Sequence, residues 1–311
     1  MRQTLVVGDL HGCYAEFETL LDKAGLVEGD QILSLGDCVD RGPETPEVLS
    51  FFQTHPGNLL CMGNHERKHV RGAAGELTLA LSQKISKLQF GDKYPAALKF
   101  MQALPLYVEL PDALCAHGYF EPGVSLDHQK PMILCGTMGG ERYLVEQYAQ
   151  PWYELYSGEV PILVGHKNYS ESNEPFVYRD KVFGLDTSCV MGKALTGLLL
   201  PAFRFVSVPS RKNHWESPRR EYADQMRTER ALPQEPVWSA KEDERLEYLI
   251  QVVAAATDKR LRVLQADPSY ANLRPRQQAS VLNPAWPTRC WSSLCSSPGW
   301  TNSILSQCAE S

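Results

Sequence analysis

Residue types that bind metals and phosphate are concentrated in five short segments of the chain. Each segment places an acid, an amide or a histidine beside a glycine. The segments are GDLHG (8–12), GDCVDRGP (36–43), GNHE (63–66), CAHG (115–118) and GH (165–166). Together they offer two Asp, one Asn and three His as candidate ligands, with a further His, Asp and Arg nearby in the chain. Hard carboxylates suit Mn²⁺, Mg²⁺ or Fe and imidazoles suit borderline metals, so this mixture disfavours calcium.

Three of these segments directly follow predicted strands. The apolar runs are 5–7, 32–35 and 59–62, and they lead into Asp9, Asp37 and Asn64 in turn. Apolar residues between the runs recur at helical spacing, which predicts crossover helices that cover a parallel sheet. Functional groups of such sheets gather beyond the carboxyl ends of the strands, so we expect the three side chains to meet in space. The fold class is α/β.

The middle of the chain predicts further helices and a second sheet. A helical pattern over 75–101 is expected to cover the core. Strand-like runs then follow at 106–110, 113–116, 161–164, 176–178, 195–200 and 203–208.

In their order and context, the five segments resemble the motifs of the calcineurin-like metallophosphoesterases. The GDxHG, GDxVDRG and GNHE forms resemble the phosphoprotein phosphatase superfamily in particular. Later segments at 184–189 and 206–209 resemble the closing strands of its small bacterial members, which are serine/threonine phosphatases or diadenosine tetraphosphatase-like. The resemblance covers about residues 3–210 and implies a metallophosphoesterase-type α/β/β/α sandwich.

The resemblance also implies a centre for two divalent metal ions. The implied ligands are Asp9 and His11 for the first ion, Asp37 bridging both ions, and Asn64, His117 and His166 for the second. We expect Mn²⁺, with Fe, Mg²⁺ or Zn²⁺ as alternatives. The implied chemistry is direct attack on phosphorus by a metal-bridging hydroxide, because metals lower the pKa of bound water towards ~7.

Four further residues have implied roles in catalysis and substrate binding. His65, steadied by Asp40, resembles the proton donor to the leaving alkoxide. Arg41 is expected to hold phosphate oxygens through its planar fork, with Asn64 also contacting the substrate. Arg142 is the candidate for a second phosphate-binding arginine, the alternative being a solvated helix charge next to Glu141.

Two departures from the family motifs bear on which branch of the metallophosphoesterases this chain resembles. Tyr119 replaces the second glycine of the CxHGG segment. Lys167, Asn168 and Tyr169 follow His166, where nucleases and phosphodiesterases of the wider fold have a second histidine. The missing histidine favours the phosphoprotein phosphatase branch.

The expected function is hydrolysis of phosphomonoesters, and phosphoserine or phosphothreonine in proteins is the favoured substrate. The alternative is a symmetrical bis(5'-nucleosyl)-tetraphosphatase that hydrolyses diadenosine tetraphosphate. The Asp40-Arg41 and His65-Glu66 pairs favour the protein phosphatases, because the symmetrical tetraphosphatases often carry Ala-Arg and His-Asp there. An inactive binding scaffold is the third hypothesis, although all six ligand types are present.

Composition limits the partners and the location. The 311 residues carry 31 Lys plus Arg against 37 Asp plus Glu, and this net charge of −6 disfavours a coat of nucleic acid or anionic membrane. No apolar stretch approaches the ~20 residues of a membrane span, and we expect no export signal. Nine scattered Cys without a CxxC pair indicate reduced thiols and a cytoplasmic protein. The expected partner is a phosphoprotein or a small phosphorylated substrate, and the oligomeric state is open.

The chain is expected to have three parts. We expect a catalytic domain at 1–210, a charged linker and amphipathic helix at 211–265, and a flexible tail at 266–311. The helix, predicted over 239–265, should dock on the catalytic domain. Outside the motifs, Cys13 and Cys38 are read as packed thiols. Four histidines match no motif and are expected to be surface or capping residues: His55, His69, His128 and His214.

Overall fold

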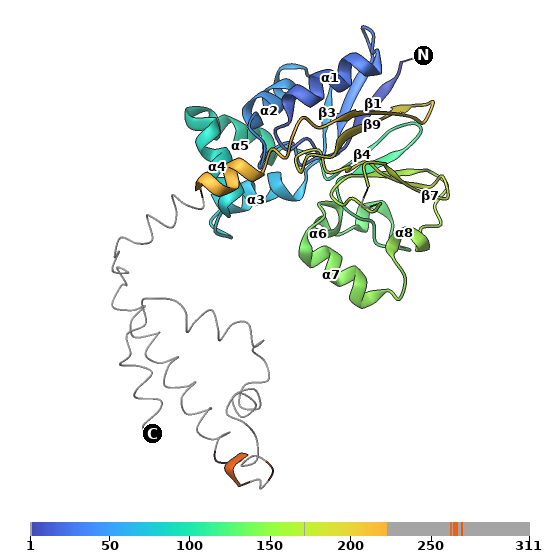
Figure 1. Cartoon of the computed structure of the whole chain (residues 1–311). Coiled ribbons are helices and arrows are strands. Elements are labelled where there is room, and N and C mark those ends of the chain that lie inside the picture. The colour runs from blue at the N-terminus through green and yellow to red at the C-terminus, as the bar shows by residue number, and fades with distance from the viewer. Residues whose placement is uncertain (1, 171, 223–261, 263, 267–268, 270–311) are drawn as a thin grey trace. The chain divides into compact units, whose positions relative to one another are not determined.

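The computed structural model describes residues 2–170, 172–222, 262, 264–266 and 269 (Figure 1). The chain falls into two units, Met1–Leu232 and Pro233–Ser311. All the predicted site residues belong to the first unit. The predicted helix over 239–265 and the tail over 266–311 lie almost wholly outside the described residues, so the proposed domain boundaries stay predictions. Among the described residues, none of the helices has the length and apolar composition needed to cross a membrane.

The first sheet brings three motif segments to one edge. Its strand order is β10 (Arg204–Pro209), β9 (Ala194–Leu200), β1 (Thr4–Val7), β2 (Gln31–Ser34) and β3 (Leu59–Leu60). Strands β1, β2 and β3 are parallel, as predicted. Val7 pairs with Ser34, and Ser34 pairs with Leu60, so the three carboxyl ends are level. The segments that follow therefore leave the sheet at the same edge.

The second sheet likewise brings the motif segments around His117 and His166 to one edge. Its order is β4 (Tyr107–Glu109), β5 (Leu114–Ala116), β6 (Ile162–Val164), β8 (Val182–Gly184) and β7 (Phe176–Tyr178). Strands β5, β6 and β8 are parallel, and Ala116, Val164 and Gly184 lie side by side. His117 and His166 therefore follow the carboxyl ends of neighbouring strands. The sequence patterns missed β8, and the runs at 195–200 and 203–208 extend the first sheet instead of the second.

Alternating side chains build the layers of the sandwich. Leu5 and Val7 pack on one side of β1 against helix α1, whereas Val6 points into the space between the sheets with Leu163 and Leu185. Three helices cover the outer face of the first sheet: α1 (Tyr14–Ala24), α2 (Thr45–Thr54) and α5 (Tyr94–Gln102). Three others cover the second: α6 (Pro131–Leu134), α7 (Met138–Gln147) and α8 (Trp152–Leu155). The α/β/β/α sandwich is confirmed.

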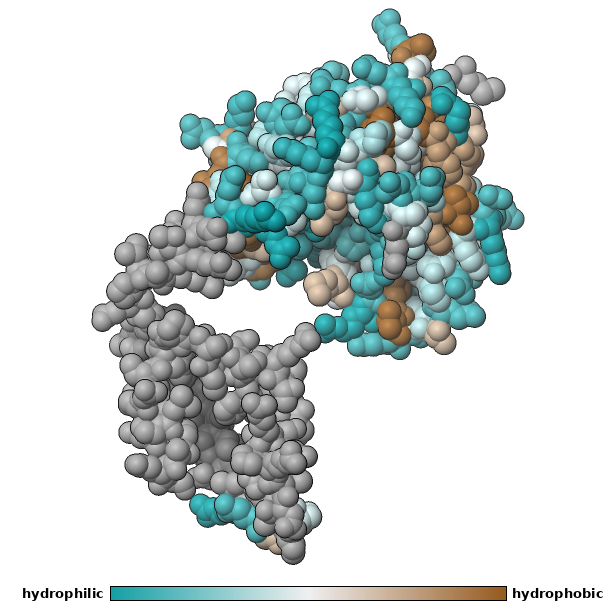
Figure 2. All heavy atoms as spheres, in the orientation of Figure 1, coloured by the Kyte–Doolittle hydropathy of each residue, from teal (hydrophilic) through white to brown (hydrophobic). Residues whose placement is uncertain are grey.

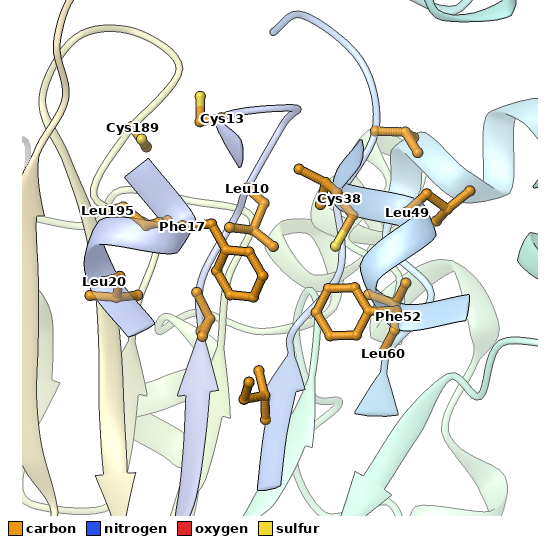
Figure 3. Packing of buried hydrophobic residues seen from close by; sticks show 14 of the residues in the cluster. Leu10, Cys13, Phe17, Leu20, Cys38, Leu49, Phe52, Leu60, Cys189 and Leu195 are labelled. Atoms are coloured by element: carbon orange, nitrogen blue, oxygen red, sulfur yellow. The ribbon is translucent and has the colours of Figure 1, made fainter. Parts of the chain in front are cut away.

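Helix α1 shows how the apolar pattern determines the packing. Phe17, Leu20 and Ala24 lie three or four residues apart and are buried, as predicted. Phe17 and Leu20 face the sheet next to Leu195 (Figure 3). Full burial of one such side chain contributes about 1.5–3 kcal/mol. The helix ends at Gly25, whose φ of 68° closes it in the left-handed conformation that glycine tolerates.

Two more helices lie close to the motif edge. Helix α3 (Asn64–Ala73) begins directly at Asn64, so the GNHE segment forms its first turn. Helix α4 (Leu81–Phe90), together with α5, accounts for most of the helical pattern predicted over 75–101. Residues 216–222, in the predicted charged linker, are also helical. On the face shown in Figure 2, hydrophilic residues cover most of the described surface and hydrophobic residues are scattered.

Candidate metal centre and phosphate site

The motif turns hold the backbone in sparsely populated conformations. Five of the nine non-glycine residues with positive φ in the described part are predicted site residues: His11, Asp37, Asp40, Arg41 and His166. Such residues cost about 1–3 kcal/mol each and cluster at functional sites. Hydrogen bonds between the turns maintain them, because the N–H groups of His11 and Gly12 donate to the carbonyls of Asp37 and Cys38 at 2.8 and 2.9 Å.

Asp37 lies at the centre of the cluster. Its Oδ2 is 3.6 Å from Nε2 of His11, and its Oδ1 is 3.3 Å from Nε2 of His117. The two oxygens therefore face two different groups of candidate ligands, which is the arrangement a bridging carboxylate needs. Although burial opposes ionisation, the imidazoles of His117 and His65 hold the pKa of Asp37 well below its usual value. A Cβ at Gly63 would lie 2.2 Å from Oδ1, so this approach requires glycine.

Asn64 collects the second group of ligands. Its Oδ1 lies 3.1 Å from Nε2 of His117 and 3.0 Å from Nδ1 of His166. These three residues come from α3 and from the ends of β5 and β6. They converge on one point, as the predicted second metal site requires.

His11 is presented to the cluster in one tautomer. Its Nδ1–H donates to the carbonyl of Val39 at 2.8 Å, which leaves the Nε2 lone pair facing Asp37. Burial, followed by the nearby Arg41 and His65, lowers the pKa of His11 well below its usual value. A neutral imidazole with a lone pair on Nε2 is the form that binds metals, and here Nη1 of Arg41 donates to that lone pair at 3.0 Å.

Asp9 lies between the two groups but farther from each. Its Oδ1 accepts the backbone N–H of His166 at 2.9 Å, and its Oδ2 is 4.0 Å from Nε2 of His11. Burial and the neighbouring Asp186 raise the pKa of Asp9 well above its usual value. Asp186 belongs to the 184–189 segment and was not among the predicted site residues.

The donor set fits divalent metal ions. Two triads, His11/Asp37/His65 and Asp37/His117/His166, each bring one ligand atom per residue within 4.8 Å of the others. Nδ1 of His117 and Nε2 of His65 are buried without a hydrogen-bond partner. Buried polar atoms of this kind are costly unless something satisfies them.

Residues 3–195 match the calcineurin-like phosphoesterase family. The chain belongs to this family. The predicted resemblance is therefore confirmed, and so is the assignment of the chain as a hydrolase of phosphoesters. Members of this family use divalent metals, with which the His and Asp clusters are compatible.

The curated relatives of this phosphoesterase carry a specific name. This chain is 28% identical over 239 residues to bis(5'-nucleosyl)-tetraphosphatase PrpE [asymmetrical] from Bacillus subtilis. The match spans 68% of this chain and 96% of the relative. The protein of the same name from Geobacillus thermodenitrificans is 29% identical, over 67% of this chain and 95% of the relative. The crystal structure of a putative diadenosine tetraphosphatase aligns with a TM-score of 0.53 and 21% identity, over 67% of this chain and 94% of that chain, which shows the shared fold.

The phosphoesterase places His65 between Asp40 and Asp37, one of the candidate metal ligands. Nδ1 of His65 is 2.6 Å from Oδ2 of Asp40, and Nε2 lies 3.9 Å from Oδ2 of Asp37. Asp40 is also bound by two residues that sequence reasoning missed. Nε2 of His69 is 2.9 Å from Asp40 Oδ1, and the side-chain amide of Gln83 donates to Oδ2. Burial opposes ionisation of Asp40, but the bonds from His65 and His69 lower its pKa strongly.

Glu66 stabilises the turns by accepting hydrogen bonds from their backbone. Its carboxylate accepts four backbone N–H groups, from Asp37, Cys38, Val39 and Gly63, at 2.7–3.2 Å. The last residue of the GNHE motif therefore fixes the loop that carries Asp37. In the sequence, only its place as the last residue of the GNHE motif could have indicated this role.

One of the two arginines expected to bind phosphate, Arg142, does not lie at the cluster. Nη1 of Arg41 is 3.0 Å from Nε2 of His11, so its guanidinium lies beside the candidate metal ligands, and its role in phosphate binding stays a prediction. Arg142 is exposed on α7 and has no hydrogen bond or ion pair with any described residue of the cluster. The neighbouring Glu141 pairs with Lys167 at 2.7 Å instead. On α3, Arg67 has a buried Nε without a hydrogen-bond partner and lies one helical turn after Asn64.

Two of the four unassigned histidines correct the expectation. His69 is fully buried and also contacts the Tyr94 hydroxyl, 3.0 Å from Nδ1. His214 is buried too, with Nε2 2.8 Å from Oε1 of Glu16. The interpretation of both as surface or capping residues was wrong, because each satisfies a buried carboxylate. His55 and His128 are exposed, and Cys13 and Cys38 are packed thiols, as predicted.

Proposed function

We propose that this phosphoesterase hydrolyses dinucleoside tetraphosphates asymmetrically, into a nucleoside monophosphate and a nucleoside triphosphate. The observation that carries phosphoester hydrolysis is the position of Asp37, whose oxygens face two groups of metal ligands beside Arg41 and His65. The curated relatives support the substrate, because their match spans about two thirds of this chain and nearly all of their own length. This proposal replaces the symmetrical cleavage considered from the sequence.

Different residues of the chain would bind the metal ions, bind the phosphate and donate the proton. Asp9, His11, Asp37, Asn64, His117 and His166 would hold two divalent ions. Such ions supply a water of lowered pKa and neutralise phosphate charge. Arg41 would bind a phosphate oxygen from its place beside His11. His65 would carry a proton on Nε2 and give it to the departing oxygen, while Asp40 keeps the ring oriented through Nδ1.

One specific observation favours a second activity on phosphoserine or phosphothreonine. The buried Asp40-His65 pair is equipped to protonate a poor leaving group, and a serine alkoxide is far more basic than a phosphate oxygen, whose second pKa is about 6. We therefore retain protein phosphatase activity as the second candidate. The mixed carboxylate and imidazole donors support Mn²⁺ as the preferred ion. The six described cysteines are free and buried, which supports a reducing compartment such as the cytoplasm.

One preparation loaded in turn with Mn²⁺, Mg²⁺, Fe²⁺ and Zn²⁺ tests these proposals. Diadenosine tetraphosphate, a phosphoserine peptide and an aryl phosphate are compared, and the nucleotides are separated by ion exchange. We expect ATP plus AMP, at a higher kcat/KM than phosphate release from the peptide. Two molecules of ADP would establish symmetrical cleavage, and a preference for the peptide would reverse the order of the candidates. Asp37→Asn should abolish every activity, and inactivity of the parent with all four metals would leave the scaffold hypothesis.

A further inference from the structure

A hollow lined by aromatic side chains opens beside the second group of metal ligands. We call it the aromatic pocket, and its volume is about 550 Å³. Most of its lining residues come from α7, from α8 with the segment before it, and from the segment after β6; helices α7 and α8 are labelled in Figure 1. Its walls include Tyr119, Tyr148, Trp152, Tyr153, Lys167 and Tyr169. Small-molecule sites occupy roughly 300–1,000 Å³, so the size suits a nucleoside.

One residue of the aromatic pocket contacts a candidate metal ligand. The ring of Tyr119 meets the ring of His166 edge to face, with centroids 5.3 Å apart. Lys167, which also lines the pocket, is the next residue after His166. Tyr119 stands where the family motif has a second glycine, so this sequence places a ring there. A ligand in the pocket would thus lie next to a phosphate bound at the cluster.

Contacts between the rings hold the walls of the pocket, which suit a flat, polar ligand ring. The indole N–H of Trp152 donates to the Tyr169 hydroxyl at 3.2 Å, and the rings of Tyr153 and Tyr169 meet edge to face at 5.6 Å. The Tyr119 hydroxyl is buried without a hydrogen-bond partner. Stacking of a base on such rings contributes about 1–3 kcal/mol, whichever base it is. These features point to a nucleobase.

The rim of the pocket supplies a charge for phosphate. Nζ of Lys167 is 2.7 Å from Oε1 of Glu141, and the two side chains are 49% and 42% exposed. Exposed pairs of this kind are weak, so Lys167 can exchange Glu141 for a phosphate oxygen at little cost. This cation belongs to the pocket lining and follows the candidate ligand His166 directly in the chain, so we expect it to be within reach of the first phosphate of a bound nucleotide.

We propose that the aromatic pocket binds one nucleoside of the substrate and places that nucleoside's own α-phosphate at the metal centre. This inference rests on the proposed function. Water then attacks the α-phosphorus, and the bond from this phosphorus to the oxygen bridging to the β-phosphorus breaks. The water oxygen ends in AMP, and ATP leaves with the bridging oxygen. The pocket thereby makes the cleavage of a symmetrical molecule asymmetrical.

Hydrolysis of diadenosine tetraphosphate in ¹⁸O-labelled water tests the site of attack. Mass spectrometry should find one ¹⁸O in AMP and none in ATP. Label in ATP would mean attack at the β-phosphorus and would overturn the inference, although the proposed function would stand. Formation of ADP alone, or hydrolysis of only the phosphopeptide, would mean instead that the proposed function fails.

Substitution of Tyr148, which lines the pocket from the end of α7, tests the binding surface. We expect Tyr148→Leu to lower kcat/KM for diadenosine tetraphosphate, relative to that for an aryl phosphate, by about tenfold. Tyr148→Phe keeps the ring and should retain the parental ratio. Tyr14→Leu, on α1 at the outer face of the first sheet, is the matched control. Inhibition of aryl phosphate hydrolysis should likewise be stronger by AMP than by ribose 5-phosphate, and the difference should vanish in Tyr148→Leu. Equal inhibition in the parent would overturn the assignment of the pocket to the base.

Discussion

At the scale of single residues, the position of His65 predicts that the rate lost on its substitution depends on the leaving group of the substrate. Nδ1 is committed to Asp40, so the ring can act only through Nε2, which is buried without a partner and faces Asp37. General acids of this kind contribute about 10²–10⁴ in rate. We expect His65→Asn to lower kcat by that factor on a phosphoserine peptide and much less on diadenosine tetraphosphate, whose phosphate leaving group needs little protonation. Steady-state rates on both substrates check this, and equal losses would contradict a role as proton donor.

The two candidate arginines make a matched pair. Arg67 follows Asn64 by one helical turn and has a buried Nε with no hydrogen-bond partner, so an anionic substrate can satisfy it. Arg142 is exposed and has no contact with the cluster. We expect Arg67→Ala to raise KM for diadenosine tetraphosphate about tenfold, because a hydrogen bond to a charged group contributes roughly 1.5–3 kcal/mol. Arg142→Ala should leave KM within about twofold. The reverse result would restore the prediction from the sequence.

Residue types and motif order were enough to predict which side chains the structure brings together, because each follows a strand end; their role as metal ligands stays a prediction. They were not enough to predict His69 and Gln83, which bind the same carboxylate as His65. Gln83 comes from α4, and no local pattern indicates that this helix reaches Asp40. Contacts made by chain segments far apart in sequence leave no periodic signal in either segment.

At the scale of elements, Glu16 ties α1 to the segment after β10. Its Oε1 accepts the backbone N–H of Arg211 at 3.0 Å and lies 2.8 Å from Nε2 of His214, with Cys13 close by. Burial alone would raise the pKa of Glu16, but the bonds from His214 and Arg211 lower it to about 2. Because the folded pKa lies below the ordinary value of 4.5, the stabilisation is full above pH 4.5 and is lost as the pH falls towards 2.

Glu16→Gln should therefore lower the free energy of unfolding at pH 7 by about 1.5–3 kcal/mol. The difference from the parent should shrink steadily between pH 4.5 and pH 2. Urea unfolding at a series of pH values measures it. Glu18→Gln, an exposed position on the same helix, is the control and should change the stability by less than about 0.5 kcal/mol. A difference that does not depend on pH would exclude the ionised carboxylate as its source.

Strands were harder to assign than helices. Strand β8 consists of Val182, Phe183 and Gly184, too short to show alternation, and it is recognised only through its pairing with β6. The runs that became β9 and β10 were located well, but their sheet was not. Which sheet a strand joins depends on register with β1, some 190 residues earlier in the chain, and strand propensity does not encode that.

At the scale of the whole molecule, the fold concentrates like charges in a buried centre. Asp9, Asp37 and Asp186 lie close enough that burial and mutual repulsion raise the pKa of Asp9. The guanidinium of Arg41 lies beside His11 and supplies positive charge next to this centre. Divalent ions bound there would remove the repulsion and satisfy the unpartnered imidazole nitrogens, so metal binding and stability should be linked.

We therefore expect Mn²⁺ to raise the melting temperature of the metal-free protein. An ion that binds only the folded state stabilises it by about 2.7 kcal/mol at a hundred times Kd. For a domain of this size, that corresponds to a rise of roughly 5–10 °C. Differential scanning fluorimetry with increasing Mn²⁺ measures the shift, and a chelator should reverse it. Asp37→Asn removes a charge that faces both groups of ligands, so its melting temperature should respond much less. An equal shift in parent and variant would place the stabilising ion elsewhere in the molecule.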